Sequence, residues 1–179
     1  MTRQVALLRG INVGRSKRVG MADLRESVEA LGYDDVRTYL QSGNVVFTGK
    51  DGRPERAAQK IEDQLAERLG LDVRVLVRTR DELAEVIDRN PLSEIASDPR
   101  RLLVAFLSSS PDPKRLRDVD PADFEPDAFA VGAREIYLWC PDGFHATKLG
   151  HAFWEKQLQL TATARNWNTV TKLLALADG

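Results

Sequence analysis

The chain has 179 residues, of which 42% are hydrophobic and 30% are charged, and its formal net charge is -1 at pH 7. This composition predicts a globular protein with a buried core, built as one domain or two small ones. A chain so close to neutral has no overall attraction for nucleic acid or an anionic membrane, so an electrostatic binding surface would have to be local. The apolar runs are far shorter than the roughly 20 residues of a membrane span, and we expect a cytoplasmic protein without membrane contact.

The first half of the chain predicts a βαββαβ order. Glycines that tolerate a left-handed backbone follow both helical segments, and Ser42, Gly43 and Asn44 are typical of a turn between two strands. This order is that of a ferredoxin-like module, in which two helices cover one face of an antiparallel sheet. In chain order, we expect a strand at 3–8, a helix at 21–31, two strands within 35–49, a helix at 54–69 and a strand at 71–78.

The second half predicts a similar order without any repeat of residues. A capping box, Thr79-x-x-Glu82, starts a connecting helix that continues to about Arg89, and the polar loop 90–99 follows it. We therefore predict an α+β protein with two tandem ferredoxin-like modules, residues 1–78 and 101–179, joined by 79–100. The later elements are expected as a strand at 101–107, a Pro-capped helix near 111–116, strands near 127–132 and 135–140, a helix at 148–157, a strand at 160–164 and a helix at 166–177.

Three motifs mark the chain: ALLRGINVG with MADLR near the start, TYLQSGNVVF in the middle and TARNWNTVTKL near the end. Together, in this order, they resemble the bacterial family catalogued as domain of unknown function 1697. The resemblance covers essentially the whole chain and implies tandem α/β plaits, but it names no biochemical role. The family pattern falls on Arg9, Gly10, Asn12, Gly14, Ser42, Gly43, Asn44, Lys148, Arg165, Asn166 and Thr169. Arg15 departs from the pattern, because members commonly have a second glycine there.

The segment from Arg9 to Gly20 is a candidate phosphate-binding loop. It holds three glycines and four cationic side chains without one acid. Glycines let backbone N–H groups approach an anion, and the helix that follows adds the positive end of its dipole. The glycine spacing nevertheless fits neither a Walker A loop nor GxGxxG, so the alternative is a surface turn with solvated cations. Candidate ligand-binding residues here are Arg9, Asn12, Gly14, Arg15 and Lys17.

Ser42 and Asn44 are the next candidates, because the first and third strands of a plait are neighbours and the loops at their ends can meet. A purely structural turn explains the same residues. Near the C-terminus, Asn166 is a natural helix N-cap, and Arg165 beside it can hold a phosphate or a carboxylate. The alternative for Arg165 is a salt bridge to a neighbouring acid. Lys148 completes the candidate set as a matched family position.

No catalytic constellation stands out in the remaining chemistry. His145 and His151 with Glu155 do not supply three zinc ligands at suitable spacing, and Cys140, at the end of an apolar strand, is typical of a small buried side chain. Tyr137 and Trp139 share one face of a strand, which favours packing over stacking on bases. We therefore expect no metal and no cofactor.

The sequence favours a protein that binds a phosphate-bearing small molecule or a nucleic acid through the glycine and arginine loop. Two other classes stay open. One is an enzyme acting on a small phosphorylated substrate, with Lys148 or a histidine as acid or base and Arg9 and Arg165 stabilising charge. The other is an interaction module whose loop contacts a partner protein or a second copy in a homodimer.

Overall fold

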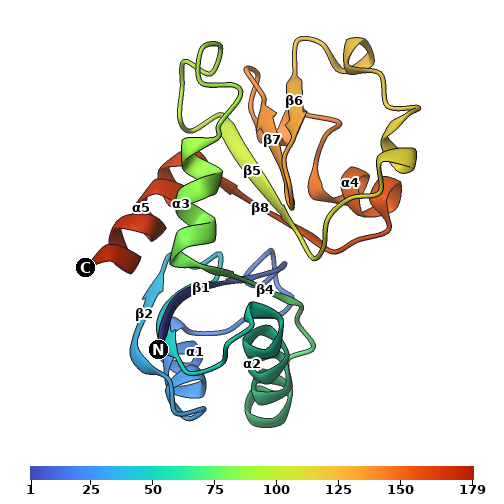
Figure 1. The fold of residues 1–179 in the computed structure, drawn as a ribbon. Helices are drawn as coiled ribbons and strands as arrows, with labels where there is room; N and C mark the ends of the chain where they lie inside the picture. The colour runs from blue at the N-terminus through green and yellow to red at the C-terminus, as the bar shows by residue number, and fades with distance from the viewer. The chain divides into compact units, whose positions relative to one another are not determined.

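The structure is a computed structural model that describes residues 1–179. The fold is α+β, with two four-stranded antiparallel sheets and five α-helices (Figure 1). The chain divides into two compact units, one formed by residues 1–84 with 172–179 and the other by residues 85–171. None of the helices combines the length and apolar character that crossing a membrane requires.

The first unit is built on a sheet with the strand order β2-β3-β1-β4. Alternate residues of these strands, such as Ala6, Leu8 and Phe47, pack into one core with the apolar sides of two helices. Figure 1 shows both helices on the same side of this sheet. The elements are β1 (Thr2–Leu8), α1 (Met21–Glu29), β2 (Asp34–Tyr39), β3 (Asn44–Gly49), α2 (Pro54–Leu69) and β4 (Val75–Thr79).

The second unit has a sheet with the order β6-β7-β5-β8. Its core gathers alternate residues such as Leu103, Ala105 and Leu138 against Trp154 of the one α-helix on that face. The elements are β5 (Leu102–Leu107), the 3₁₀ helices η1 (Pro113–Leu116) and η2 (Pro121–Phe124), β6 (Ala128–Val131), β7 (Glu135–Trp139), the 3₁₀ helix η3 (Phe144–Ala146), α4 (His151–Leu158) and β8 (Ala162–Asn166). Two further helices, α3 (Arg80–Asp88) and α5 (Trp167–Asp178), cross the boundaries between the units.

Most of the predicted elements are present, and several of their ends are confirmed in detail. Gly32 and Gly70 are left-handed, with φ of 81° and 63°. The capping box is complete: the Thr79 N–H donates to Glu82 Oε2 at 2.8 Å, and the Glu82 N–H donates to Thr79 Oγ1 at 3.1 Å. Asn166 caps α5, because its Oδ1 accepts from the Thr169 N–H at 2.9 Å.

The second unit differs from expectation between β5 and β6. The helix predicted near 111–116 is the four-residue 3₁₀ helix η1, and η2 is a second short turn rather than part of a longer helix. Aspartates cap both turns, and prolines recur through the segment, so no α-helical run can form between them. The helix expected from Lys148 also begins later, at His151.

Asp51 anchors the connection from β3 to α2. Its side chain is 8% exposed and accepts hydrogen bonds from the Lys60 ammonium at 2.6 Å and from the Tyr33 hydroxyl, with Arg56 at 3.8 Å. Burial raises the pKa of Asp51, but the bonds from Lys60 and Tyr33 and the nearby positive charges outweigh it, so the pKa lies below its ordinary value. This carboxylate fixes the entry of α2.

We predict that Asp51→Asn lowers the free energy of unfolding at pH 7 by about 1 to 3 kcal/mol, because it weakens charge-assisted hydrogen bonds in a buried position. A carboxyl whose folded pKa is depressed stabilises the fold above its unfolded pKa of about 3.9, and this stabilisation is lost as the pH falls through the folded pKa. The difference between wild type and variant should therefore shrink at acidic pH. Urea unfolding of both proteins at neutral and acidic pH measures this difference in free energy. A difference that stays the same at both pH values would contradict the prediction.

Candidate functional site

The loop that follows β1 is a compact hairpin. The Asn12 N–H donates to the Lys17 carbonyl at 3.1 Å, and Val13 and Ser16 form a β-bridge inside it. Asn12 and Lys17 have left-handed backbones, with φ of 54° and 50°, as does Gly14 with 60°. A non-glycine residue in this region is uncommon, although asparagine tolerates it. The loop is therefore a defined structure and not an extended linker.

The Asn12 carboxamide holds this loop in place. Its Nδ2 donates to the Val19 carbonyl at 3.0 Å and to the Gln41 carbonyl at 2.8 Å, and its Oδ1 accepts from the Val19 N–H at 2.9 Å. The side chain thus closes the base of the loop and ties it to the turn between β2 and β3. These bonds engage both polar atoms of Asn12, which gives the residue a positioning role.

The loop and the turn also pack against each other through Gly43. The Leu8 N–H donates to the Gly43 carbonyl at 2.9 Å, and Gly43 has a φ of 86°. A Cβ at Gly43 would lie 2.6 Å from Ile11 Cδ1, so the close approach of turn and loop requires glycine. Asn44 is buried next to the turn, where its Nδ2 donates to the Tyr39 carbonyl at 2.7 Å and to Ser42 Oγ at 3.1 Å.

The loop carries three exposed cations, Arg15, Lys17 and Arg18, and none of them has an ion-pair partner. Arg18 is oriented by its Nη2, which donates to the Gly14 carbonyl at 2.7 Å. Arginines elsewhere in the chain commonly form salt bridges with carboxylates. Examples are Arg3–Asp35, Arg37–Asp35, Arg74–Glu62, Arg80–Asp178 and Arg100–Asp98.

Two aliphatic side chains are exposed in the same region, Val13 in the loop at 65% and Leu40 in the turn at 50%. Leu40 is also left-handed, with a φ of 61°, which is an unusual conformation for a bulky residue. Neither feature has a signal in the sequence, because hydrophobicity patterns predict burial and do not predict a positive φ. The exposed surface of the loop and turn is therefore cationic and includes two exposed aliphatic side chains.

The candidates Arg165, Asn166 and Lys148 belong to the second unit. Arg165 lies on β8, is 7% exposed, and donates from its Nη1 to Thr163 Oγ1 at 2.8 Å and to the Ala164 carbonyl at 2.9 Å. Burial lowers the pKa of Arg165 to about 10. The burial of Arg165 and these two hydrogen bonds give it a structural role inside the fold. Asn166 likewise has a structural role, because its side chain caps α5.

Lys148 is exposed and lies among carboxylates. It lines a small hollow of about 130 Å³ together with Asp123, Glu125, Asp127 and Asp142. Carboxylates of this number repel an anion more strongly than one ammonium attracts it. The neighbouring Leu149 packs into the core of the second unit, whereas Arg165 is on the opposite face of the sheet, next to Val104. The structure thus separates Lys148 from Arg165.

The other reactive side chains serve the fold. Cys140 is fully buried, as expected, and burial raises the pKa of its thiol to about 11, which disfavours the nucleophilic thiolate. The Glu155 carboxylate accepts from the Ala162 N–H at 3.0 Å. The Tyr137 hydroxyl donates to the Val86 carbonyl at 2.6 Å, and its ring is 1% exposed, which confirms packing for this aromatic residue.

Comparison with known proteins gives a family and a fold. Residues 1–137 match the family described as "Protein of unknown function (DUF1697)". A solved structure of a conserved bacterial protein from Streptococcus pneumoniae is similar over 98% of both chains, with a TM-score of 0.76 and 22% sequence identity. No curated protein matches the chain. At this identity the similarity establishes the fold alone.

We predict that Asn12→Gly lowers the free energy of unfolding by about 1 to 3 kcal/mol, because it removes the side-chain hydrogen bonds to Val19, which are half-buried, and to Gln41, while keeping the left-handed backbone accessible. Amide exchange at Val19, whose N–H loses its acceptor, should accelerate. Lys17→Gly is the matched control, since it is also left-handed in this loop but its side chain makes no such bonds. Equal exchange rates at Val19 in the two variants would contradict the assigned role of Asn12.

We also predict that Leu40→Asn raises the free energy of unfolding by about 1 kcal/mol, because asparagine relieves the left-handed strain at an exposed position. Val13→Asn is the control, since it removes another exposed aliphatic side chain where φ is not positive. Chemical denaturation of both variants measures the difference. A gain of the same size in both would attribute the effect to lost hydrophobic exposure.

Proposed function

Because the chain belongs to the DUF1697 family of proteins of unknown function, its activity has to be inferred from its own side chains, and we propose that it binds nucleic acid through the phosphate backbone. The observation that carries this proposal is the set of three exposed cations without acidic partners, Arg15, Lys17 and Arg18, on a loop fixed by Asn12. Unpaired cations that share one short loop favour an anionic ligand, since their mutual repulsion is relieved only by negative charge.

A polymer of phosphates fits this surface better than a small phosphorylated molecule. Small ligands are usually held in concave sites that cover most of their surface. The cations of this loop are instead exposed at its outer side, where successive phosphates of a strand can meet separate side chains. Arg9 and Ser42 at the margins of the loop and turn are the further candidates within this proposal.

The proposed architecture is a pair of ferredoxin-like modules, residues 1–78 and 101–179, joined by 79–100. In its support, both sheets have the strand order expected of that fold, read as β4-β1-β3-β2 in the first and β8-β5-β7-β6 in the second. Two helices complete the pattern in the first unit. In the second unit, the short helices η1 and η2 occupy the place of the first helix in the order of elements.

We predict that replacing Arg15, Lys17 and Arg18 by alanine weakens binding of a fluorescent single-stranded oligonucleotide. The plot of log association constant against log salt concentration should also become less steep by about 2 to 3, roughly one per lost phosphate contact. Fluorescence anisotropy at several salt concentrations measures both quantities. Affinity of the wild type that does not change with salt would exclude this mode of binding.

A matched control removes the same number of charges elsewhere. Lys114, Arg115 and Arg117 are exposed in the segment of η1, close in sequence to Asp112, Asp118 and Asp120. Their replacement by alanine should leave the affinity and the salt slope unchanged. An equal loss in both triple variants would show that net charge and not the loop determines binding, and the proposal would then fail.

A further inference from the structure

Strand β6 is an open edge of the second sheet. It pairs with β7 on one side, and the strand order ends with it on the other. An edge strand presents backbone N–H and C=O groups that can pair with an added strand. Natural proteins usually protect such edges with charges, proline or a bulge, so an unprotected edge is informative.

The register identifies which backbone groups of β6 face outward. The Gly132 N–H donates to the Glu135 carbonyl at 2.8 Å, so these residues form a hydrogen-bonded pair at the hairpin. Bonded pairs alternate along an antiparallel ladder, so Ala130 and Ala128 bond to β7 and the backbone groups of Phe129 and Val131 point away from it. The structure gives neither residue another backbone partner.

Strand β6 has no charge, proline or bulge along its own residues. Its four residues are AFAV, and Val131 is 41% exposed. Strand β2, one of the two edge strands of the first sheet, is different. It carries Asp34, Asp35 and Arg37, and its pairing with β3 shifts register between Asp34 and Arg37. Strand β2 thus carries charges and an irregular register, whereas β6 has neither and is available for pairing.

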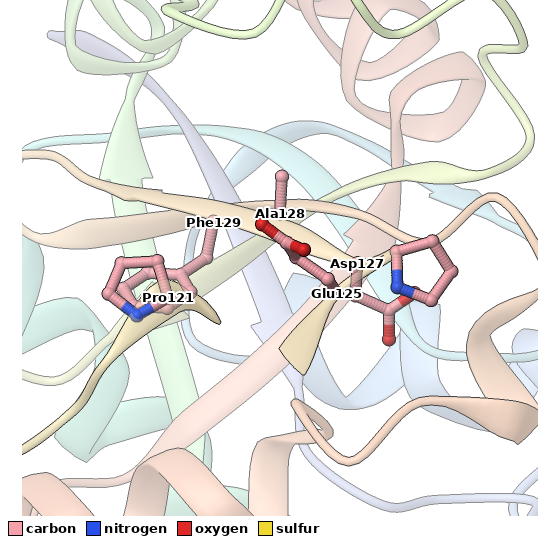
Figure 2. Close-up of a pocket in the computed structure, with 6 residues that line it drawn as sticks. Pro121, Glu125, Asp127, Ala128 and Phe129 are labelled. Atoms are coloured by element: carbon pink, nitrogen blue, oxygen red, sulfur yellow. The ribbon is translucent and has the colours of Figure 1, made fainter. Parts of the chain in front are cut away.

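A hollow of about 590 Å³ lies where β6 begins (Figure 2). Its apolar lining comes from the rings of Pro121, Pro126 and Phe129 and from Ala128, and its charged lining from the carboxylates of Glu125 and Asp127. Glu125 and Asp127 also line the smaller hollow that contains Asp123, Asp142 and Lys148. An apolar lining with carboxylates fits the aliphatic stem and charged end of a lysine or arginine side chain.

We propose that β6 accepts an extended basic segment of a partner protein as an additional strand, with a lysine or arginine of that segment in the adjoining hollow. Backbone pairing with Phe129 and Val131 supplies affinity that does not depend on sequence, and the carboxylates select a cationic side chain. Pairing of β6 with the same strand of a second copy is the alternative that the test below distinguishes. This function is separate from the nucleic-acid loop of the first unit.

The test uses a short synthetic peptide of alternating lysine and valine, titrated into the whole protein and followed by amide chemical shifts and calorimetry. We expect saturable shifts at the Phe129 and Val131 amides. A matched peptide of alternating glutamate and valine should bind at least about tenfold more weakly, since the charge complementarity is reversed. Equal binding of the two peptides, or shifts confined to other parts of the chain, would overturn the proposal.

Variants separate edge pairing from simple charge attraction. Val131→Pro removes one outward N–H without breaking a bond to β7, and we expect about tenfold weaker binding or more, whereas the control Val131→Thr keeps the N–H and retains binding. Glu125→Gln with Asp127→Asn should weaken binding of the lysine peptide and reduce its salt dependence. If Val131→Pro binds as well as Val131→Thr, the edge is not used. If sedimentation shows that wild type self-associates and Val131→Pro does not, a second copy occupies the edge and the proposed partner is wrong.

Discussion

The link between the loop and the turn, made by the Asn12 carboxamide, is the interaction on which the candidate surface depends. One side chain bonds to Val19 at the far end of the loop and to Gln41 in the turn. Without this link, the loop would lose its side-chain tie to the turn, and the exposed cations would be less fixed in their arrangement. Gly43 completes the constraint, because only a residue without Cβ lets the turn approach Ile11. Charge placed on a fixed backbone loses less entropy on binding, which is the benefit of preorganisation.

The near-neutral total charge conceals two surfaces of opposite character. The first unit carries unpaired cations on its loop, and the second carries carboxylates around Glu125 and Asp127 at the open edge of its sheet. A pI near 6.2 would have argued against nucleic-acid binding if charge were spread evenly. Because charges are screened beyond about 8 Å at physiological salt, local clusters decide what each surface attracts. Arg165, by contrast, is buried and adds little to either field at the surface.

Much of the fold was predictable because local chemistry and the hydrophobic pattern agree. Gly32, Gly70 and the Thr79–Glu82 box fix helix ends through backbone requirements that a sequence displays directly. The segment between β5 and β6 was harder to predict, since aspartate and proline start an α-helix and a 3₁₀ turn in the same way. The left-handed Leu40 was not predictable at all, because leucine has no preference for that conformation and only the packing of the surrounding turn imposes it.

The candidate site was predictable in part for the same reason. That the loop and turn would meet followed from strand adjacency in a plait, and the bond between Asn12 and Gln41 confirms it. The sequence does not show which polar side chains are free to bind a ligand, because that depends on the hydrogen bonds each side chain makes in the folded structure. Asn12 and Asn44 look like ligand-binding amides in the sequence, yet the side-chain amide of each donates to groups of the fold itself. The exposed cations without an acidic partner in the fold are therefore the residues best able to act on a ligand, and the structural amides hold their loop in position.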